Sequence, residues 1–377
     1  MKQEIIDKIN RLASQDEPFL FVINYQGDKA FIRLLSDINP EECLFDFEGR
    51  GNLSHAWKET WKEGTSEEEI SETTWQIEPP FYEDYERSFN IVKSNIMAGN
   101  SYLTNLTCRV PVSCNLSVEE IFHRAKGKYK LLLRRKKTQA EDKDYLKEEP
   151  QNKAHLKEEN IEENLTPFVC FSPETFVRIK GGRIYSYPMK GTLDASLPNA
   201  EKLLMEDQKE AAEHATIVDL IRNDLSRVAE DVRVDKYRYI DVLHTNKGNI
   251  LQTSSEISGR LPEDYPHHLG EILDAQLPAG SITGAPKDKT MQIIQEAEGY
   301  DRGFYTGIMG IYDQGELNSA VMIRFIEEEE VFPSKTENRM NYEAIRKLYF
   351  KAGGGITSKS DCRKEYEEVI QKIYLPI

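Results

Sequence analysis

Two pairs of glutamates in this chain have the spacing of neighbours on a helix. Glu210 and Glu213 lie in one predicted helix, and Glu365 and Glu368 lie in the last one. Because residues i and i+3 project from the same side of a helix, each pair presents two carboxylates together. The two pairs could share one Mg²⁺ ion, which prefers carboxylates, water and an anionic substrate as ligands. The alternative is that both pairs are solvated helix surface.

The apolar residues near these pairs predict which carboxylates face inward. Glu213 shares a helical stripe with Ile217 and Leu220, and Glu368 lies beside Val369. A carboxylate among apolar side chains is costly unless it is paired or bound to a metal. We therefore expect Glu213 and Glu368 to point into the protein.

Three further charged residues could carry chemistry or bind an anion. Lys190, in YPMKGT, follows a predicted strand, where partial desolvation would favour the neutral, nucleophilic amine. An exposed lysine at a sheet edge is the alternative. Glu174, in SPETF, begins a neighbouring strand and is a candidate proton-transfer group. Arg324 lies in the apolar run VMIRF, so we expect it to have a buried anionic partner.

The segment LPAGSITGAPK, residues 277–287, reads as a loop between elements. Its glycines let the backbone approach a ligand, and Ser281 and Thr283 are suitable donors to a carboxylate or phosphate. Neither this loop nor the glycine run 353–355 has the spacing of a P-loop or a GxGxxG motif, so phosphate cradling is not expected. The alternative is a surface turn leading into a helix at 288–297.

The composition is that of an acidic chain with enough apolar residues for a large core. The formal net charge is −16, so nucleic acid and anionic membranes are not expected as partners. No apolar run reaches the length of a membrane span, and the start, MKQEIIDKIN, lacks the apolar region of a signal peptide. The cysteines form no CxxC pair and the histidines no HExxH. This pattern favours a reduced cytoplasmic protein and disfavours zinc.

The apolar patterns predict strands and helices in clusters without strict βαβ alternation, which favours an α+β fold with antiparallel sheets. One helix carries a stripe from Tyr85 to Ile96 and ends at Gly99. Two more helices are predicted at 200–229 and 361–373. The predicted strands are 101–112, 168–171, 175–179, 183–189, 249–257, 305–312 and 317–326, with short strands within 18–48, and the last two long ones are expected to form a hairpin.

Two segments are predicted to be charged insertions. Residues 134–165 are nearly all charged and repeat LKEE, so they cannot bury enough apolar surface to order firmly. Residues 327–342 have the same character. We expect one catalytic domain over 1–377, with 1–80 as a short N-terminal sub-region.

Six of these segments resemble the chorismate-binding enzyme family, in the family's order from about residue 80 onward. They are AGNSYLTNL, CFSPETF, YPMKGT, AEHATIVDLIRNDLSRV, LPAGSITGAPK and KAGGGITSKS. The resemblance implies two antiparallel sheets packed orthogonally with helices outside, in four layers α/β/β/α. Lys190 falls where aminodeoxychorismate synthases that use covalent catalysis have lysine, whereas anthranilate synthases are expected to have alanine. Leu103 falls where isochorismate and salicylate synthases have a water-activating lysine.

Within the family, the resemblance is therefore greatest to component I of aminodeoxychorismate synthase. The implied reaction replaces the C4 hydroxyl of chorismate with an amino group, towards 4-aminobenzoate and folate. Lys190 is then the nucleophile and Glu174 the general acid/base. The implied Mg²⁺ ligands are Glu213, Glu368, Glu210 and Glu365. The implied substrate-binding residues are Arg324, Tyr305, Thr283, Gly354, Gly355, Gly191, Thr192 and Gln252.

The ammonia source can be argued from the cysteines. A triad glutaminase needs a cysteine on a tight, glycine-flanked turn with a histidine base, and no cysteine here is flanked by glycine. We therefore expect a separate glutamine amidotransferase subunit as partner. The rival functions are anthranilate synthase component I and a non-catalytic chorismate-binding regulatory protein.

Overall fold

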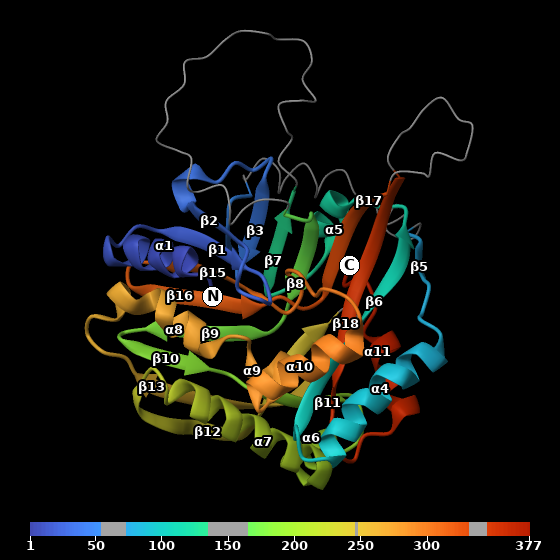
Figure 1. The fold of residues 1–377 in the computed structure, drawn as a ribbon. Coiled ribbons are helices and arrows are strands. Elements are labelled where there is room, and N and C mark those ends of the chain that lie inside the picture. The colour runs from blue at the N-terminus through green and yellow to red at the C-terminus, as the bar shows by residue number, and fades with distance from the viewer. Residues whose placement is uncertain (54–72, 135–164, 246–247, 332–344) are drawn as a thin grey trace, which may run out of the picture.

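The computed structural model describes residues 1–53, 73–134, 165–245, 248–331 and 345–377 (Figure 1). Within these ranges, two antiparallel sheets of nine strands each pack face to face, and helices cover both outer faces. The strands of one sheet run across those of the other in Figure 1. The predicted α+β class, with two packed antiparallel sheets flanked by helices, is confirmed.

The first sheet contains the strands predicted to hold Glu174 and Lys190. Pro188 divides the predicted strand 183–189 into two, because proline has no N–H to give to the ladder, and both pieces pair with the same long strand. In spatial order the strands are β11 (Met189–Asp194), β13 (Gly248–Arg260), β10 (Arg183–Ser186), β9 (Thr175–Lys180), β16 (Glu316–Val321), β15 (Ile308–Asp313), β1 (Phe19–Ile23) and β2 (Ala30–Leu34), and β12 (Glu230–Thr245) pairs with β13.

The second sheet contains the glycine run and ends against the 277–287 segment. In spatial order its strands are β14 (Gly284–Ala285), β6 (Leu103–Cys114), β18 (Ile345–Ile356), β17 (Phe325–Val331), β8 (Phe168–Ser172), β7 (Tyr129–Leu133), β3 (Cys43–Phe47) and β4 (Arg50–Gly51), and β5 (Trp75–Ile77) pairs with β6. The predicted hairpin holds for β15 and β16, but 317–326 is not one strand. Arg324 has a φ of +56°, which breaks the extended chain before Phe325 enters the second sheet.

The helices divide between the two outer faces. α1 (Gln3–Ser14), α7 (Gln208–Leu225) and α8 (Leu269–Gln276), with the short η3 (Tyr265–His268), cover the first sheet. α4 (Tyr82–Met97), α5 (Val118–Arg124), α10 (Lys287–Glu298) and α11 (Cys362–Gln371) cover the second. The predictions of α4, α10 and α11 are confirmed to within a few residues. α1 was not predicted, although its buried Ile5, Ile6, Ile9 and Ala13 follow a helical period.

The long helix predicted over 200–229 is wrong in one respect: the structure has two helices there. α6 (Ala200–Glu206) ends at Asp207, whose side chain accepts a hydrogen bond from Glu210 N at 3.0 Å and so caps α7. An aspartate at this position satisfies an N–H that a helix start leaves open. The cap therefore fixes where α7 begins, and with it the position of Glu210 in the first turn.

Both predicted insertions fall largely outside the described residues, which omit 135–164 and 332–344. The start of the second one is part of β17 instead. There Glu327 is buried and pairs with Lys351 Nζ at 2.7 Å, so the alternation of the strand overrides its charged composition.

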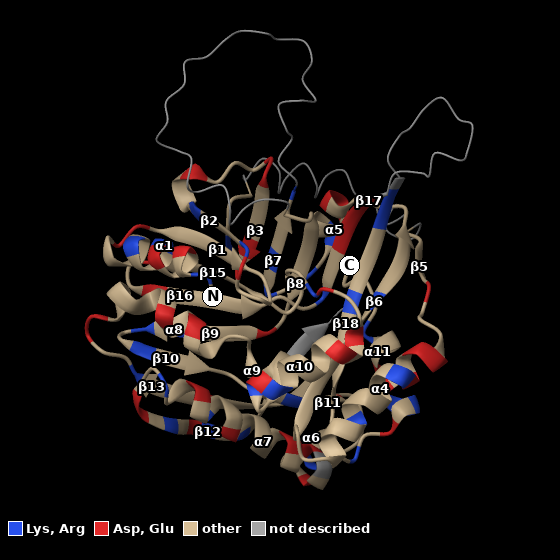
Figure 2. Ribbon diagram, in the orientation of Figure 1, with Lys and Arg blue, Asp and Glu red and all other residues tan. Residues whose placement is uncertain are grey.

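The described part has three apolar layers, one between the sheets and one under each set of helices. Figure 2 shows acidic and basic residues on the helices and also on strands β10, β12, β17 and β18. Within the described ranges, no helix is long and apolar enough to cross a membrane. All five cysteines are described, and none forms a disulfide.

Candidate active site

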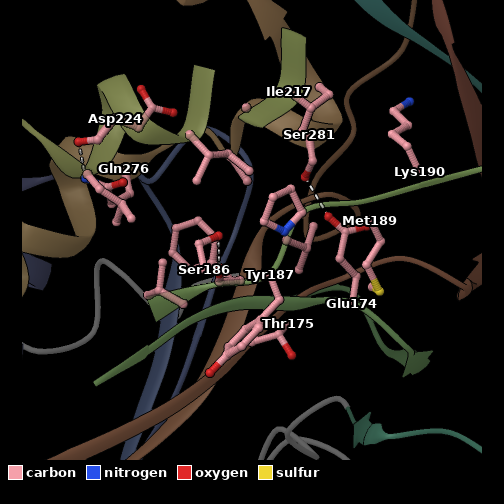
Figure 3. A pocket seen from close by; sticks show the side chains of 18 residues that line it. Glu174, Thr175, Ser186, Tyr187, Met189, Lys190, Ile217, Asp224, Gln276 and Ser281 are labelled. Carbon is pink, nitrogen blue, oxygen red and sulfur yellow. Dashed lines mark hydrogen bonds between the residues drawn. The ribbon is translucent and has the colours of Figure 1, made fainter. Parts of the chain in front are cut away.

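Glu174 lies at the start of β9, directly below α9 (Gly280–Thr283) in the loop 277–287. The Ser281 hydroxyl donates a hydrogen bond to Glu174 Oε1 at 2.6 Å, and Figure 3 shows this contact at the wall of a cavity. Burial raises the pKa of the Glu174 carboxyl, and the Ser281 hydrogen bond and the Lys190 charge oppose that rise. A carboxyl whose pKa is raised in this way is a suitable proton-transfer group.

Lys190 lies on the edge strand β11, not just after a strand as predicted. Its amine points away from Glu174 in Figure 3. A methyl group added to Gly355 of β18 would lie 3.8 Å from Lys190 Nζ, so the amine extends from the first sheet to the second. Among the described residues, none forms a hydrogen bond or ion pair with the Lys190 amine. It is therefore available to a substrate between the sheets.

A bulge in β11 aims the lysine. The register with β13 shifts between Lys190 and Thr192, and Gly191 between them has a φ of +70°, which favours glycine. Thr253 Oγ1 donates to the Lys190 carbonyl and holds the bulge. Thr192, which is exposed, lies opposite Gln252, whose buried Oε1 has no hydrogen-bond partner in the described part.

The segment 277–287 is more ordered than a loop: it contains the single-turn α9 and the two-residue β14. Lys287 at its end pairs with Asp224 of α7 at 2.8 Å, so this lysine has a structural partner. Thr283 is fully buried, and its hydroxyl lies beside the phenol of Tyr25. The role of Thr283 in binding a ligand stays a prediction.

The helix glutamates approach the lysine from two sides. A methyl group on Gly191 would lie 3.1 Å from Glu210 Oε2, and one on Gly354, next to Gly355, would lie 3.7 Å from Glu365 Oε2. Glu210 of α7 is thus a neighbour of the β11 backbone next to Lys190, and Glu365 of α11 is a neighbour of the β18 backbone next to Gly355.

The prediction that Glu368 points inward is wrong. Its side chain is 57% exposed, and Oε1 accepts an ion pair from Lys372 Nζ at 2.8 Å, one turn later. Glu365 is the buried member of that pair, at 8%. Residues i and i+3 are rotated by about 300° around the helix axis, so one carboxylate can face the protein interior while the other lies at the edge of the same helix face. Glu213 on α7 is half-buried.

Within the described ranges, no three acidic, histidine or cysteine side chains converge closely enough to hold a metal ion. The donor chemistry of Glu210 and Glu365 nevertheless fits Mg²⁺, because hard carboxylate oxygens are its usual protein ligands. Lys372 stands among the α11 carboxylates: it donates to the Gly353 carbonyl at 3.0 Å and would lie 3.8 Å from a methyl group on Gly354. The Mg²⁺ site stays a prediction.

Arg324 and Tyr305 border the inter-sheet layer. The buried anionic partner predicted for Arg324 is not found: Arg324 is half-buried and donates to the Lys372 carbonyl at 2.9 Å. Its guanidinium also lies 5.0 Å from the centre of the Tyr374 ring. Within the described residues, no carboxylate lies within ion-pair distance of it. Burial raises the pKa of Tyr305, so its phenol stays a donor.

His214 was missed by sequence reasoning, although it stands next to Glu213 in AEHATIV. It is fully buried, its Nε2 lies 2.6 Å from Ser255 Oγ, and its Nδ1 has no partner in the described part. Burial, with smaller contributions from Arg238 and Lys190, lowers its pKa to about 4. A neutral imidazole therefore fastens α7 to β13 near the lysine.

The cavity between these groups has a volume of about 120 Å³, with Glu174, Ser281 and Lys190 at one end and Asp224 and Gln276 at the other (Figure 3). That volume holds about four water molecules and is smaller than the usual ligand pocket of ~300 Å³ or more. A larger ligand must therefore extend out of it, towards the glycine run of β18.

Comparison with known proteins places these features in a family. Residues 146–376 match the family model described as chorismate binding enzyme. A Haemophilus influenzae protein described as an uncharacterized PabA-like protein is 42% identical over 375 residues, 100% of this chain and 97% of its own. Aminodeoxychorismate synthase component 1 of Bacillus subtilis is 28% identical over 359 residues, 93% of this chain and 67% of its own.

A solved structure shows the same fold. Anthranilate synthase component I from Streptococcus pneumoniae aligns with a TM-score of 0.62 and 19% identity, covering 99% of this chain and 85% of that one. At this identity the similarity shows the fold alone.

Proposed function

Since this chain belongs to the chorismate-binding enzyme family, we propose that it aminates chorismate at C4 to 4-amino-4-deoxychorismate with ammonia from a partner glutaminase. The observation that carries this proposal is Lys190: an amine without a protein partner in the described residues, aimed by a bulge from β11 towards Gly355. A lysine is a nucleophile when it is neutral, and alanine or leucine at the same place could not form a covalent intermediate.

The reaction would proceed in two balanced steps. First, Lys190 Nζ bonds to C2 of the ring as the C4–O bond breaks, and Glu174 protonates the departing hydroxyl. Next, ammonia bonds to C4 as the C2–Nζ bond breaks, and Glu174 takes back the proton that ammonia loses. The net change is hydroxyl for amine with release of water. Gln252, whose Oε1 has no partner in the described part, would orient the departing hydroxyl.

The substrate is a dianion, and the site offers groups for both carboxylates. Thr283, Tyr305, Arg324 and the backbone of Gly354 and Gly355 would bind them, and Gly191 and Thr192 would line the entrance at β11. A bound Mg²⁺ would supply Lewis-acid neutralisation of a carboxylate, held by Glu210, Glu213, Glu365 and Glu368. Neutralisation by cations and oriented donors is the usual way an acidic protein holds an anion.

A separate glutaminase follows from the cysteines. Cys43 and Cys170 are buried, and burial raises the pKa of both thiols, which disfavours the reactive thiolate. Cys108, Cys114 and Cys362 lack the glycine-flanked turn that a glutaminase nucleophile needs. The lone chain is therefore expected to use ammonium salt and not glutamine.

A product assay tests the function. The purified chain would be given chorismate, Mg²⁺ and ammonium salt, with and without aminodeoxychorismate lyase. We expect 4-aminobenzoate only when the lyase is present. Fluorescent anthranilate without lyase would establish anthranilate synthase component I instead, and chorismate binding without any turnover would indicate a regulatory binding protein.

A further inference from the structure

A buried arginine stands directly behind the loop that carries Ser281 and Thr283. Arg302 and Glu298 form an ion pair in which each side chain is 1% exposed, with Nη2 2.6 Å from Glu298 Oε1 and Nε 2.8 Å from Oε2. Nothing in the catalytic chemistry above uses this pair. Removing two charges from water is costly, and the pair is kept only where its geometry and further hydrogen bonds offset that cost.

The pair connects three elements that meet at the site. Arg302 Nη1 donates to the Ile282 carbonyl of α9 at 2.9 Å, and Nη2 donates to the Asn105 carbonyl of β6 at 2.8 Å. Glu298, the last residue of α10, accepts from Thr107 N of β6 at 2.8 Å. The guanidinium is planar with several donors in a fixed fork, which lets one side chain hold α9 and β6 at once.

Ile282 follows Ser281, the loop residue that lines the cavity and donates to Glu174. Thr283, on the other side of Ile282, is fully buried beside the Tyr25 phenol. Because α9 is a single turn of four residues, it has little structure of its own to fix the Ser281 side chain. The Ile282 carbonyl is therefore the point at which Arg302 can hold this turn.

We propose that Arg302, supported by Glu298, is a positioning residue that holds Ser281 against Glu174. The proposal rests on the proposed function for the role of Glu174. Arg302 touches neither the substrate nor the reacting atoms. It acts through the Ile282 carbonyl, and its loss loosens the Ser281–Glu174 hydrogen bond.

The experiment compares Arg302→Lys, Ser281→Ala and their double variant. Arg302→Lys keeps a cation beside Glu298 but cannot donate to Ile282, Asn105 and both carboxylate oxygens together. We expect kcat in the ammonia assay to fall about tenfold in each single variant, the usual effect of one hydrogen bond, and no further in the double variant.

The pH dependence of kcat gives a second measurement. The limb of this profile that reports the pKa of Glu174 would not shift if Arg302 had a purely structural role. The groups acting on the Glu174 carboxyl are the Ser281 hydroxyl of α9 and the Lys190 ammonium of β11, and both lower its pKa. Removal of the Ser281 contact therefore moves the Glu174 limb to higher pH, and Arg302→Lys is expected to move it in the same direction.

A matched control is Lys351→Gln. Lys351 is also a buried cation at 1% exposure, but its hydrogen bonds go to Glu327 and to the Arg302 carbonyl, and Glu327 keeps Arg109 at 3.2 Å. It should lower the melting temperature and leave the pH limb unchanged. If Arg302→Lys does not fold, Glu298→Gln replaces it, because the amide oxygen can still accept from Thr107 N.

Hydrogen exchange of residues 277–287 separates this proposal from the proposed function. Faster exchange there in Arg302→Lys, but not in Lys351→Gln, supports the positioning role even if the wild-type chain fails to aminate chorismate. Wild-type exchange in the loop, an unshifted pH limb, or additive losses in the double variant would overturn it.

Discussion

Two sides of the site hold their carboxylates in different ways. The strand side contains Glu174, next to β9, and the helix side contains the glutamates of α7 and α11. On the strand side, Glu174 is held by one hydrogen bond of 2.6 Å from the Ser281 hydroxyl. On the helix side, the Lys372 ammonium lies among the α11 glutamates and pairs with Glu368. The carboxylate of the strand side is therefore held by a neutral donor, whereas Glu368 on the helix side is paired with a cation.

The two sides thus stabilise negative charge in different ways, one with a preorganised neutral donor and the other with an exposed ion pair. A preorganised donor such as Ser281 costs no rearrangement during reaction, so its contribution is large in a water-poor cavity. An exposed ion pair such as Glu368–Lys372 is worth little and can be exchanged for another cation at low cost. We therefore expect substitutions on the strand side to affect turnover and those on the helix side to affect cation dependence.

The largest effect is expected for Lys190→Ala. Loss of the nucleophile should lower the rate of amination by at least about 10³-fold, because covalent catalysis is removed while the fold remains. The measurement is 4-aminobenzoate formation with ammonium salt and lyase, with circular dichroism as the control for folding. Full amination by this variant would remove the covalent mechanism and leave the family unchanged.

Glu174→Gln is expected to come next. The amide can still accept from Ser281 but cannot move a proton, so kcat should fall by about 10²–10⁴-fold with little change in KM. In the wild-type chain, burial raises the pKa of Glu174, and the corresponding limb of the rate profile should lie above the range of an ordinary carboxyl. The limb should vanish in the variant. A limb that persists would assign the titration to another group.

The same raised pKa has a stability consequence of known sign. The protonated carboxyl is favoured in the folded protein, so its stabilisation is full below the unfolded pKa and is lost as the pH rises through the folded one. Glu174→Gln should therefore melt at a higher temperature than wild type at pH 7. Melting curves from pH 4 to 8 test this: the difference should shrink towards acid.

The variant Lys372→Met tests whether the helix side affects the dependence on Mg²⁺. Removing the Lys372 ammonium takes away the cation that pairs with Glu368, so the Mg²⁺ concentration for half-maximal effect should fall several-fold, consistent with a pair worth up to about 1 kcal/mol. Mg²⁺-dependent shifts of the melting temperature measure this without turnover, and Lys364→Met, on the same helix, is the control. A higher Mg²⁺ requirement would mean that Lys372 helps to bind the substrate.

The smallest effects are expected at the caps of the two glutamate helices. Asp207 caps α7 and Asp361 caps α11, each through a hydrogen bond of 3.0 Å to a backbone N–H. Replacing either by alanine should cost about 1 kcal/mol of stability. Chemical denaturation measures the loss, and Asp219→Ala on the exposed face of α7 is the control. A loss at Asp219 as large as at the caps would contradict the capping role.

Much of the architecture follows from local patterns. The short apolar runs of β8 and β9, which are almost wholly buried, and the apolar stripe of α4 predict elements whose type is right. The breaks are harder. Pro188 lies between β10 and β11, Asp207 between α6 and α7, and Arg324 between β16 and β17, although each of these segments was predicted as one element. The helix α1 was not predicted.

What the sequence alone determined is the set of residue types and the family whose motifs contain them: a lysine in YPMKGT, a glutamate in SPETF and glutamates at helical spacing. What only the tertiary structure decided is which of these meet. The β11 bulge turns Lys190 towards Gly355, Glu365 rather than Glu368 faces inward, and Arg302 supports α9 from behind. These contacts join residues far apart in the chain, so their geometry depends on how sheets and helices pack, which no local spacing records.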